Sequence, residues 1–372
     1  MALLLDKDIF GISNGEQFVF GDKSKVNVRL STAEQFKKFC EVYTLDVPDF
    51  PGEPWTSIAK NLGLKKTVWS KFIPKDIFEK LLVDYIKHFL NEIKTKNQDK
   101  LWYYANIVPL EQRVLDSFAT VCYADGTEKE PYHYKRTAVG RLVSDNNINL
   151  FQMSSDRRSQ TLETRYVNGK IVSYDFKALE PRVILAINNP DALIDCDDVY
   201  TKILKLSNID VTRDIIKGTL LRILNGSTLA PLARDYDIEV EKLEVLKESI
   251  FEIFGYEKTV EKLKEQYERT GRIFTYFGRP LLVPELNEKL FFTYYMQGTS
   301  ADVCLIGFDQ INGAIQKYNL GTKIKPLAMI YDSFILDVNL DHQEIIDEHI
   351  PLSISIKLNQ QVIKFPLAKS EY

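Results

Sequence analysis

Two aspartates interrupt segments that are otherwise apolar and typical of β-strands. Asp175 stands near the end of residues 169–176, and Asp332 stands in the middle of the hydrophobic run at residues 325–338. A carboxylate in a buried strand is unfavourable alone, and two of them repel each other unless a cation lies between them. Singly, each aspartate is more often structural. Together, two strand-borne aspartates around Mg²⁺ ions are the common apparatus of in-line phosphoryl transfer.

Composition narrows the class of protein and the kind of site. The chain has 372 residues, of which 45% are hydrophobic and 27% charged, which is typical of a globular protein with two or three subdomains. Its four cysteines and four histidines are scattered and form no CxxC motif, so metal chemistry would depend on carboxylates, which suit Mg²⁺ or Mn²⁺. The net charge of −4 argues weakly against a protein that simply coats nucleic acid. No apolar run approaches the roughly 20 residues of a membrane span, so we expect no membrane partner and a cytoplasmic location.

The segments around the aspartates read as alternating helices and strands. A Pro-rich stretch at residues 47–52 ends a small N-terminal lobe, and a run of lysines without acidic residues follows it. That basic run is either a solvated face or an arm that contacts phosphates. Apolar spacing predicts further elements. These are helices over 78–95, 101–122 and 180–187, a helical region over 197–268, and a hairpin around Gly278.

A helix that opens at Thr212 carries two cations on one face. Thr212 is a plausible N-cap, and Arg213, Lys217 and Leu221 follow at intervals of four residues. Such a face could bind a polyphosphate, although basic residues four apart more often form a solvated face.

The order of several segments is more informative than any one of them. They are residues 137–142 and 149–152, the strand end Tyr174-Asp175-Phe176 with Glu180 and Arg182, the helix from Arg213 through Lys217 to Gly226, Gly278-Arg279, residues 297–302, and Tyr331-Asp332-Ser333. In this order the chain resembles the family A DNA polymerases, the bacterial DNA polymerase I type, over residues 132–340.

The resemblance implies an α+β protein with the right-hand polymerase fold, in which the palm is an antiparallel sheet and the fingers and thumb are helical. The chain would then comprise an N-terminal lobe of unknown role (1–55), a thumb-like helical region (56–130), the first part of the palm (131–187), the fingers (188–290) and the second part of the palm (291–372).

The resemblance also implies an enzyme, a DNA-directed nucleotidyltransferase that extends a primer on a template with dNTPs. Two Mg²⁺ ions, or Mn²⁺ in their place, would be held by Asp175, Asp332 and the Phe176 carbonyl, and Lys217 would act as a catalytic group beside the two aspartates. The residues expected to bind the nucleotide are Arg213, Lys217, Glu180, Leu221 and Asn225. Those expected to contact primer–template DNA are Arg141, Gln152, Arg182 and Gln297, with the basic run of Lys60, Lys65, Lys66 and Lys71.

Some positions depart from the family pattern. Leu221 stands where the family usually has an aromatic residue and Asn225 where it has tyrosine, while Tyr331 and Ser333 flank Asp332 in place of histidine and glutamate. In the family, the residue at the Glu180 position lies against the ribose 2′ carbon, braced by the tyrosine. We therefore expect Glu180 to be held more loosely, and the enzyme to prefer dNTPs but to reject ribonucleotides less strictly than relatives with both aromatic residues.

The region before the recognisable core holds no evident exonuclease motifs. We expect a polymerase without its own proofreading, of the kind that viral or mobile-element systems encode in a host cytoplasm, working with a separate exonuclease or replisome factor. Two alternatives stay open. One is a single-subunit RNA polymerase of the phage type, which often has the Asp-Ser-Phe order seen at Asp332; Glu180 and residues 140–152 favour the DNA enzyme. The other is a non-catalytic, nucleic-acid-binding replication factor that has kept the fold.

Overall fold

The computed structural model describes residues 106–131, 134–144, 150–281, 287 and 290–372, together with the backbone of four short strands near the N-terminus. The basic run at residues 60–71 and the helix expected over 78–95 lie outside the described residues. Contacts divide the chain into two units. One comprises Met1–Pro109 with Tyr276–Pro280, and the other comprises Leu110–Thr275 with Leu281–Tyr372.

The first unit contains a small antiparallel sheet whose four strands follow one another in chain order. The strands are β1 (Leu3–Asp6), β2 (Phe10–Ser13), β3 (Gln17–Phe20) and β4 (Asn27–Arg29).

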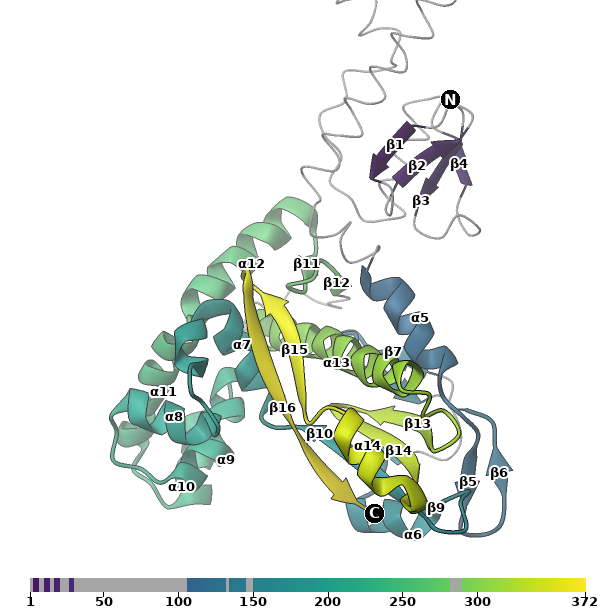
Figure 1. Ribbon diagram of the computed structural model, residues 1–372. Coiled ribbons are helices and arrows are strands. Elements are labelled where there is room, and N and C mark those ends of the chain that lie inside the picture. The colour runs from purple at the N-terminus through teal and green to yellow at the C-terminus, as the bar shows by residue number, and fades with distance from the viewer. Residues whose placement is uncertain are drawn as a thin grey trace, which may run out of the picture. The chain divides into compact units, whose positions relative to one another are not determined.

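The second unit is built on a five-stranded antiparallel sheet with the order β13-β14-β10-β16-β15 (Figure 1). Its strands are β10 (Gly169–Phe176), β13 (Ile324–Ile330), β14 (Ser333–Asn339), β15 (Ser353–Leu358) and β16 (Gln361–Glu371). The strand expected over 169–176 is confirmed, and it lies at the centre of the sheet, where β14 and β16 pair with its two edges. Together with the helices described below, this sheet confirms the expected α+β class.

The hydrophobic run at residues 325–338 is two strands and not one. Ile330 pairs with Ser333, so Tyr331 and Asp332 form the two-residue turn between β13 and β14. Asp332, expected inside or at the end of a strand, therefore lies in the turn that follows β13. Two-residue hairpin turns need a positive φ, which asparagine or glycine usually supplies. Here Tyr331 adopts a φ of 56°, so the local sequence does not signal the turn.

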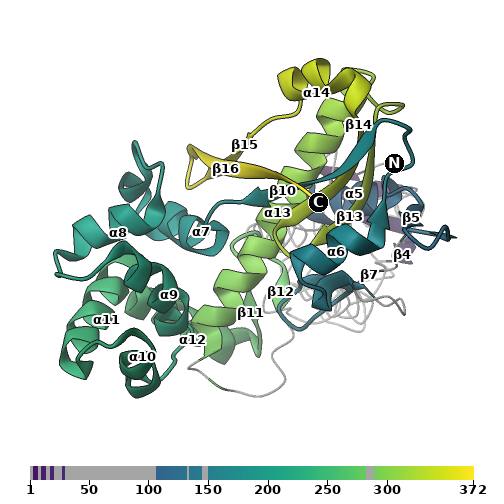
Figure 2. The same cartoon turned by 90° about the horizontal axis from the view of Figure 1, so that it is seen from below.

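One face of the sheet packs against the long helix α13 (Phe291–Lys317), which runs along it in both views (Figures 1 and 2). The ring of Phe308 on this helix lies 4.1 Å from that of Phe334 on β14, and Phe334 in turn lies 5.7 Å from Phe176 on β10. The close approach depends on Gly307, because a Cβ atom there would lie 2.7 Å from Cζ of Phe176.

The opposite face of the sheet is covered by short elements from the preceding part of the chain. They are β5 (Val121–Tyr123), β6 (Glu128–Lys129), β7 (Tyr134–Arg136), β8 (Leu142–Ser144), the 3₁₀ turn η3 (Leu150–Gln152), α6 (Ser155–Thr161) and β9 (Leu162–Glu163). The core here joins Val121, Leu150 and Leu162 to Ile171 and Ile335 of the sheet. The helix before them, α5 (Val108–Asp116), contacts α13 instead, through the ion pair of Arg113 with Asp309. The helix expected over 101–122 thus ends at Asp116, because its last residues form a strand that pairs with β6 and β9.

Helices follow the central strand and form a bundle to one side of the sheet (Figure 1). They are α7 (Leu179–Asn188), the 3₁₀ turn η4 (Pro190–Leu193), α8 (Val199–Ser207), α9 (Arg213–Leu224), α10 (Leu229–Tyr236), α11 (Val240–Phe254) and α12 (Tyr256–Thr270). They share one core, with Ile203, Leu220 and Leu246 fully buried. The helices expected over 180–187 and 197–268 are confirmed, and so is the N-cap, because the Thr212 hydroxyl accepts the Ile215 N–H at 3.3 Å.

The remaining elements are short. The hairpin expected around Gly278 is present as the paired strands β11 (Ile273–Phe274) and β12 (Pro280–Leu281), and η6 (Leu340–His342) and α14 (Gln343–His349) connect β14 to β15. Among the described residues, no helix combines the length and apolar character that a bilayer span requires.

Candidate functional site

The sheet brings Asp175 and Asp332 together although they are far apart in sequence. Asp175 lies near the C-terminal end of the central strand and pairs in register with Ser333, the residue after Asp332. The Phe176 N–H donates to the Asp332 carbonyl at 3.1 Å, which fixes the turn against the end of β10. Both predicted metal-binding aspartates, and the predicted carbonyl of Phe176, therefore occupy one end of the central strands.

The environment of these two acids disfavours two unpaired negative charges. Desolvation raises the pKa of Asp175 to about 7 although one side of it faces solvent; the charge of Asp332 adds to that rise and Arg158 opposes it. Burial likewise raises the pKa of Asp332, against the effects of its own backbone N–H and of Arg141. A bound cation would remove this penalty.

The donor set suits a hard cation. Two carboxylates and a backbone carbonyl are oxygen ligands, which Mg²⁺ and Mn²⁺ prefer. Within the described residues no group of three or more His, Cys, Asp or Glu side chains could hold a metal by itself. The residues present therefore fit an ion that takes its remaining ligands from substrate or water.

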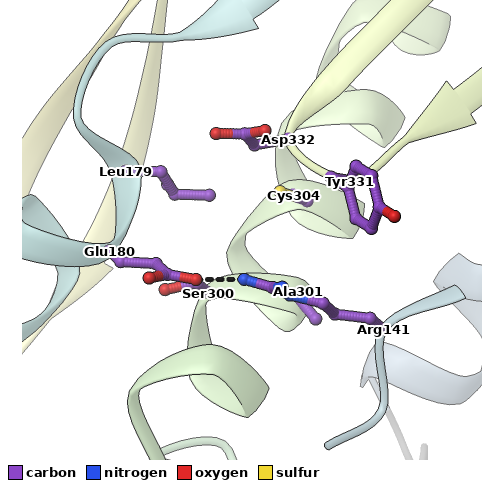
Figure 3. Close-up of a pocket in the computed structure, with 8 residues that line it drawn as sticks. All are labelled: Arg141, Leu179, Glu180, Ser300, Ala301, Cys304, Tyr331 and Asp332. Carbon is purple, nitrogen blue, oxygen red and sulfur yellow. Dashed lines mark hydrogen bonds and ion pairs between the residues drawn. The ribbon is translucent and has the colours of Figure 1, made fainter. Parts of the chain in front are cut away.

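An open pocket with about 290 Å³ of empty space adjoins Asp332 (Figure 3). Its lining residues are Arg141, Leu179, Glu180, Ser300, Ala301, Cys304, Tyr331 and Asp332. Across it, the Arg141 guanidinium forms an ion pair with the Glu180 carboxylate. The same guanidinium lies 5.8 Å from the ring centroid of Tyr331. Three separate segments of the chain are thus joined around one pocket.

Glu180 is firmly held, which corrects the expectation of a loose side chain. Only 13% of its side chain is exposed, and burial raises the pKa of its carboxyl while Arg141 counteracts that effect. Asn225, which replaces the expected tyrosine, is the C-cap of α9, and its side-chain oxygen is buried without a hydrogen-bond partner in the part of the chain that the structure describes. Arg141 therefore supplies a partner for Glu180 that the sequence did not reveal.

The other predicted nucleotide-binding residues lie on α9. Arg213 and Lys217 are exposed and lie one turn apart, whereas Leu221 is half-buried against the core of the helical bundle. Lys217 has no ion-pair partner among the residues that the structure describes. Arg213, in contrast, is bound to Asp198, at 2.5 Å between Nε and Oδ2.

The residues predicted to contact DNA differ in how far their side chains are exposed to solvent. Gln152 is exposed in η3, and Gln297 is half-buried on α13. Arg182 is only 3% exposed, and its guanidinium donates to the carbonyls of Lys177, Cys196 and Asp197 at 3.1, 3.1 and 2.7 Å. Its guanidinium therefore holds backbone, in place of the predicted contact with DNA.

Sequence reasoning missed Arg158, Asp198 and Tyr200 as members of this region. Arg158 belongs to a run of arginines, and Asp198 to an acidic stretch before a helix, but neither pattern tells which charge it will meet. Both interactions depend on the tertiary fold.

Comparison with known proteins agrees with this geometry. The sequence model for "DNA polymerase family A" matches residues 80–368, well over half of the chain. DNA polymerase I of Thermus thermophilus is 23% identical over 275 residues, which are 66% of this chain and 32% of the relative. DNA polymerase I of Pseudomonas aeruginosa is 23% identical over 244 residues, 59% of this chain and 26% of the relative. The chain thus spans about a third or less of the length of these relatives.

A solved structure shows the same fold. The POL domain of Pol1 from M. smegmatis, solved in a complex with DNA primer–template and dNTP, has a TM-score of 0.52 and 18% sequence identity, and the match covers 91% of this chain and 64% of that one. The expected right-hand architecture, with an antiparallel-sheet palm, is therefore confirmed. Given the fold, the ordered motifs and the extent of the family match, this chain belongs to DNA polymerase family A.

Proposed function

We propose that this protein is a template-directed DNA polymerase that extends a primer with dNTPs by nucleotidyl transfer. The observation that carries the proposal is that Asp175 and Asp332 lie close together at one end of the central strands. The charge of Asp332 disfavours the charged form of Asp175, and a bound cation would offset this repulsion. The DNA polymerase I relatives and the neighbour that binds primer–template and dNTP support the same reaction.

The proposal assigns the parts of the chain to the parts of the hand. The sheet with α13 is the palm, in residues 131–187 and 291–372, and helices α8–α12 are the fingers, in residues 188–290. The thumb-like region, the N-terminal lobe, the absence of proofreading and the cytoplasmic location stay predictions.

Asp175, Asp332 and the Phe176 carbonyl would hold Mg²⁺, or Mn²⁺, with two ions present in the full reaction. Bound there, such ions would neutralise the developing phosphate charge and activate the primer hydroxyl. The protein's own contribution is to fix one carboxylate on a paired strand and the other in the turn beside it, so that little reorganisation is needed when substrate arrives.

On α9, Lys217 would neutralise the triphosphate and donate a proton to the leaving pyrophosphate, while Arg213 would bind the phosphates. Leu221 and Asn225 would lie along the same face beside the base and sugar. Arg141 and Gln297 would reach the minor-groove edge of the primer–template, where acceptors are present in every base pair. Gln152 would also contact the DNA. The predicted contacts of Lys60, Lys65, Lys66 and Lys71 with the DNA backbone belong to the same proposal.

A direct test is extension of a labelled primer–template by the full chain with Mg²⁺ and either dNTPs or NTPs. We expect extension with dNTPs and loss of extension when the metal is chelated. Preferred use of NTPs would favour the phage-type RNA polymerase, and DNA binding without any extension would favour the non-catalytic replication factor.

The held position of Glu180 gives a second expected result. A carboxylate fixed against the sugar excludes a 2′-hydroxyl, so Glu180→Ala should lower the dNTP/NTP ratio of kcat/KM by about tenfold. Arg141→Ala should lower the ratio in the same direction, because it releases Glu180; the ratio cancels any general loss of DNA binding.

Asn225→Tyr is the informative control for that result. Since Glu180 already has Arg141 as its partner, we expect this substitution to change the sugar ratio by less than about twofold. A large tightening by Asn225→Tyr, or an unchanged ratio in Glu180→Ala, would show that Arg141 does not fix a sugar gate.

A further inference from the structure

Arg213, which is proposed to bind the incoming triphosphate, already forms an ion pair with the carboxylate of Asp198. Arg213 donates through Nε to Oδ2 of Asp198 at 2.5 Å and through Nη2 to Oδ1 at 3.3 Å, a two-pronged contact. A second carboxylate, that of Asp214, lies 3.5 Å from Nη1 but is 90% exposed. Asp198 is therefore the principal counter-ion of Arg213, and it occupies the fork that a phosphate would use.

Asp198 is fixed by contacts that do not involve Arg213. It is the N-cap of α8, where Oδ1 accepts the Tyr200 N–H at 3.2 Å and Oδ2 accepts the Thr201 hydroxyl at 2.6 Å. The hydrogen bonds from Arg213 and these cap contacts lower the pKa of Asp198 to about 2, so the carboxylate is charged at neutral pH.

The backbone just before Asp198 is fixed as well. Buried Arg182 donates to the carbonyls of Cys196 and Asp197, the two preceding residues. The position of the carboxylate thus belongs to the scaffold, whereas Arg213 reaches it with a long and half-exposed side chain.

The pair lies within electrostatic reach of the carboxylate site. The ring of Tyr200 lies 5.6 Å from the guanidinium of Arg213. Burial raises the pKa of Tyr200, and the charges of Asp198, Glu180 and Asp332 raise it further. Glu180 and Asp332 line the pocket, so Tyr200 lies within the range of their charges.

We propose that Asp198 is a resident competitor for Arg213, displaced by the phosphates of the incoming nucleotide, and that it thereby sets the nucleotide affinity of the enzyme. This inference rests on the proposed function. Carboxylate and phosphate oxygens accept the same guanidinium fork, so the two cannot occupy it together. The pair is half-exposed and a triphosphate carries several charges, so exchange is feasible, and the face of Tyr200 keeps the guanidinium in place meanwhile.

The test uses Asp198→Asn in the full chain. Asparagine has the same shape and is an equally good N-cap, so the negative charge is what is lost. In single-turnover extension the KM for dNTP should fall by about two- to fivefold, the range typical of a half-exposed ion pair, with a smaller change in the maximum rate. Calorimetric titration with tripolyphosphate, without DNA, should show tighter binding by a similar factor.

Two comparisons make the result specific. Asp235→Asn removes the partner of Arg222 on the same helix, at 2.7 Å, and should leave tripolyphosphate binding unchanged. In an Arg213→Ala background, Asp198→Asn should lose its effect. If Asp198→Asn does not fold, Asp198→Ser, which also caps, takes its place.

Unchanged or weaker tripolyphosphate binding by Asp198→Asn would overturn the inference. Weaker binding would show instead that Asp198 orients Arg213 for the nucleotide. The titration does not depend on catalysis. If Asp198→Asn binds tripolyphosphate more tightly but the wild-type chain does not extend primers, the competitor role of Asp198 is supported and the polymerase activity is refuted. If the chain extends primers but Asp198→Asn does not bind tripolyphosphate more tightly, the polymerase activity is supported and the competitor role is refuted.

Discussion

Alanine in place of Asp175 or Asp332 is expected to reduce nucleotide incorporation by about a thousandfold, while primer–template binding stays within about twofold of wild type. Asp175 is held on a paired strand and Asp332 in the adjacent turn, and each carboxylate would bind the metal, not the DNA. Single-turnover extension measures the first quantity, and fluorescence anisotropy with labelled primer–template measures the second.

Glu371→Gln is the matched control for the aspartates. Glu371 lies on β16 of the same sheet, opposite Val172, and pairs with the exposed Lys170 away from the site. Its loss should leave incorporation unchanged. If either aspartate variant keeps a tenth of wild-type activity, the pair is not the metal-binding centre.

Lys217→Ala is expected to lower the maximum rate of incorporation by about a hundredfold, which is the usual effect of removing a general acid. Arg213→Ala should mainly raise the KM for dNTP, because Arg213 only binds and is already paired in the free protein. Single-turnover kinetics over a range of dNTP concentrations separate the two effects.

Lys217→Arg distinguishes proton donation from charge. Arginine keeps the positive charge at this exposed position but does not give up its proton. We expect the KM to be nearly restored while the rate stays low. Full recovery of the rate in Lys217→Arg would limit Lys217 to charge neutralisation. Arg222→Ala removes another positive charge from α9 and is the control for loss of charge alone; it should leave the maximum rate unchanged.

The sequence predicted the central strand, α7 and the N-cap at Thr212 because each has a local signal: an apolar run, helical spacing, a hydroxyl before a helix. The turn at Tyr331 was missed because its positive φ is enforced by the pairing of β13 with β14 and not by a turn-forming residue. The strand Val121–Tyr123 was missed because three residues carry too little pattern.

The sequence predicted which residues belong to the candidate site but not which side chains pair with each other there. That Asp175 and Asp332 share one site followed from their apolar surroundings and from motif order. The pairings of Arg141 with Glu180 and of Arg213 with Asp198 join segments of different elements, and the sequence holds several other acids that each arginine could have met. Arg182 was predicted to contact DNA, but it is buried and donates to three backbone carbonyls instead.

The position of β10 at the centre of its sheet has a consequence for biosynthesis. Asp175 is made early, but the strands that flank it, Ser333–Asn339 and Gln361–Glu371, leave the ribosome only some 160 residues later or more. Until then, β10 has two unpaired edges, and such edges invite aggregation. A chain that ends before β14 therefore lacks both Asp332 and the strand that brings it beside Asp175.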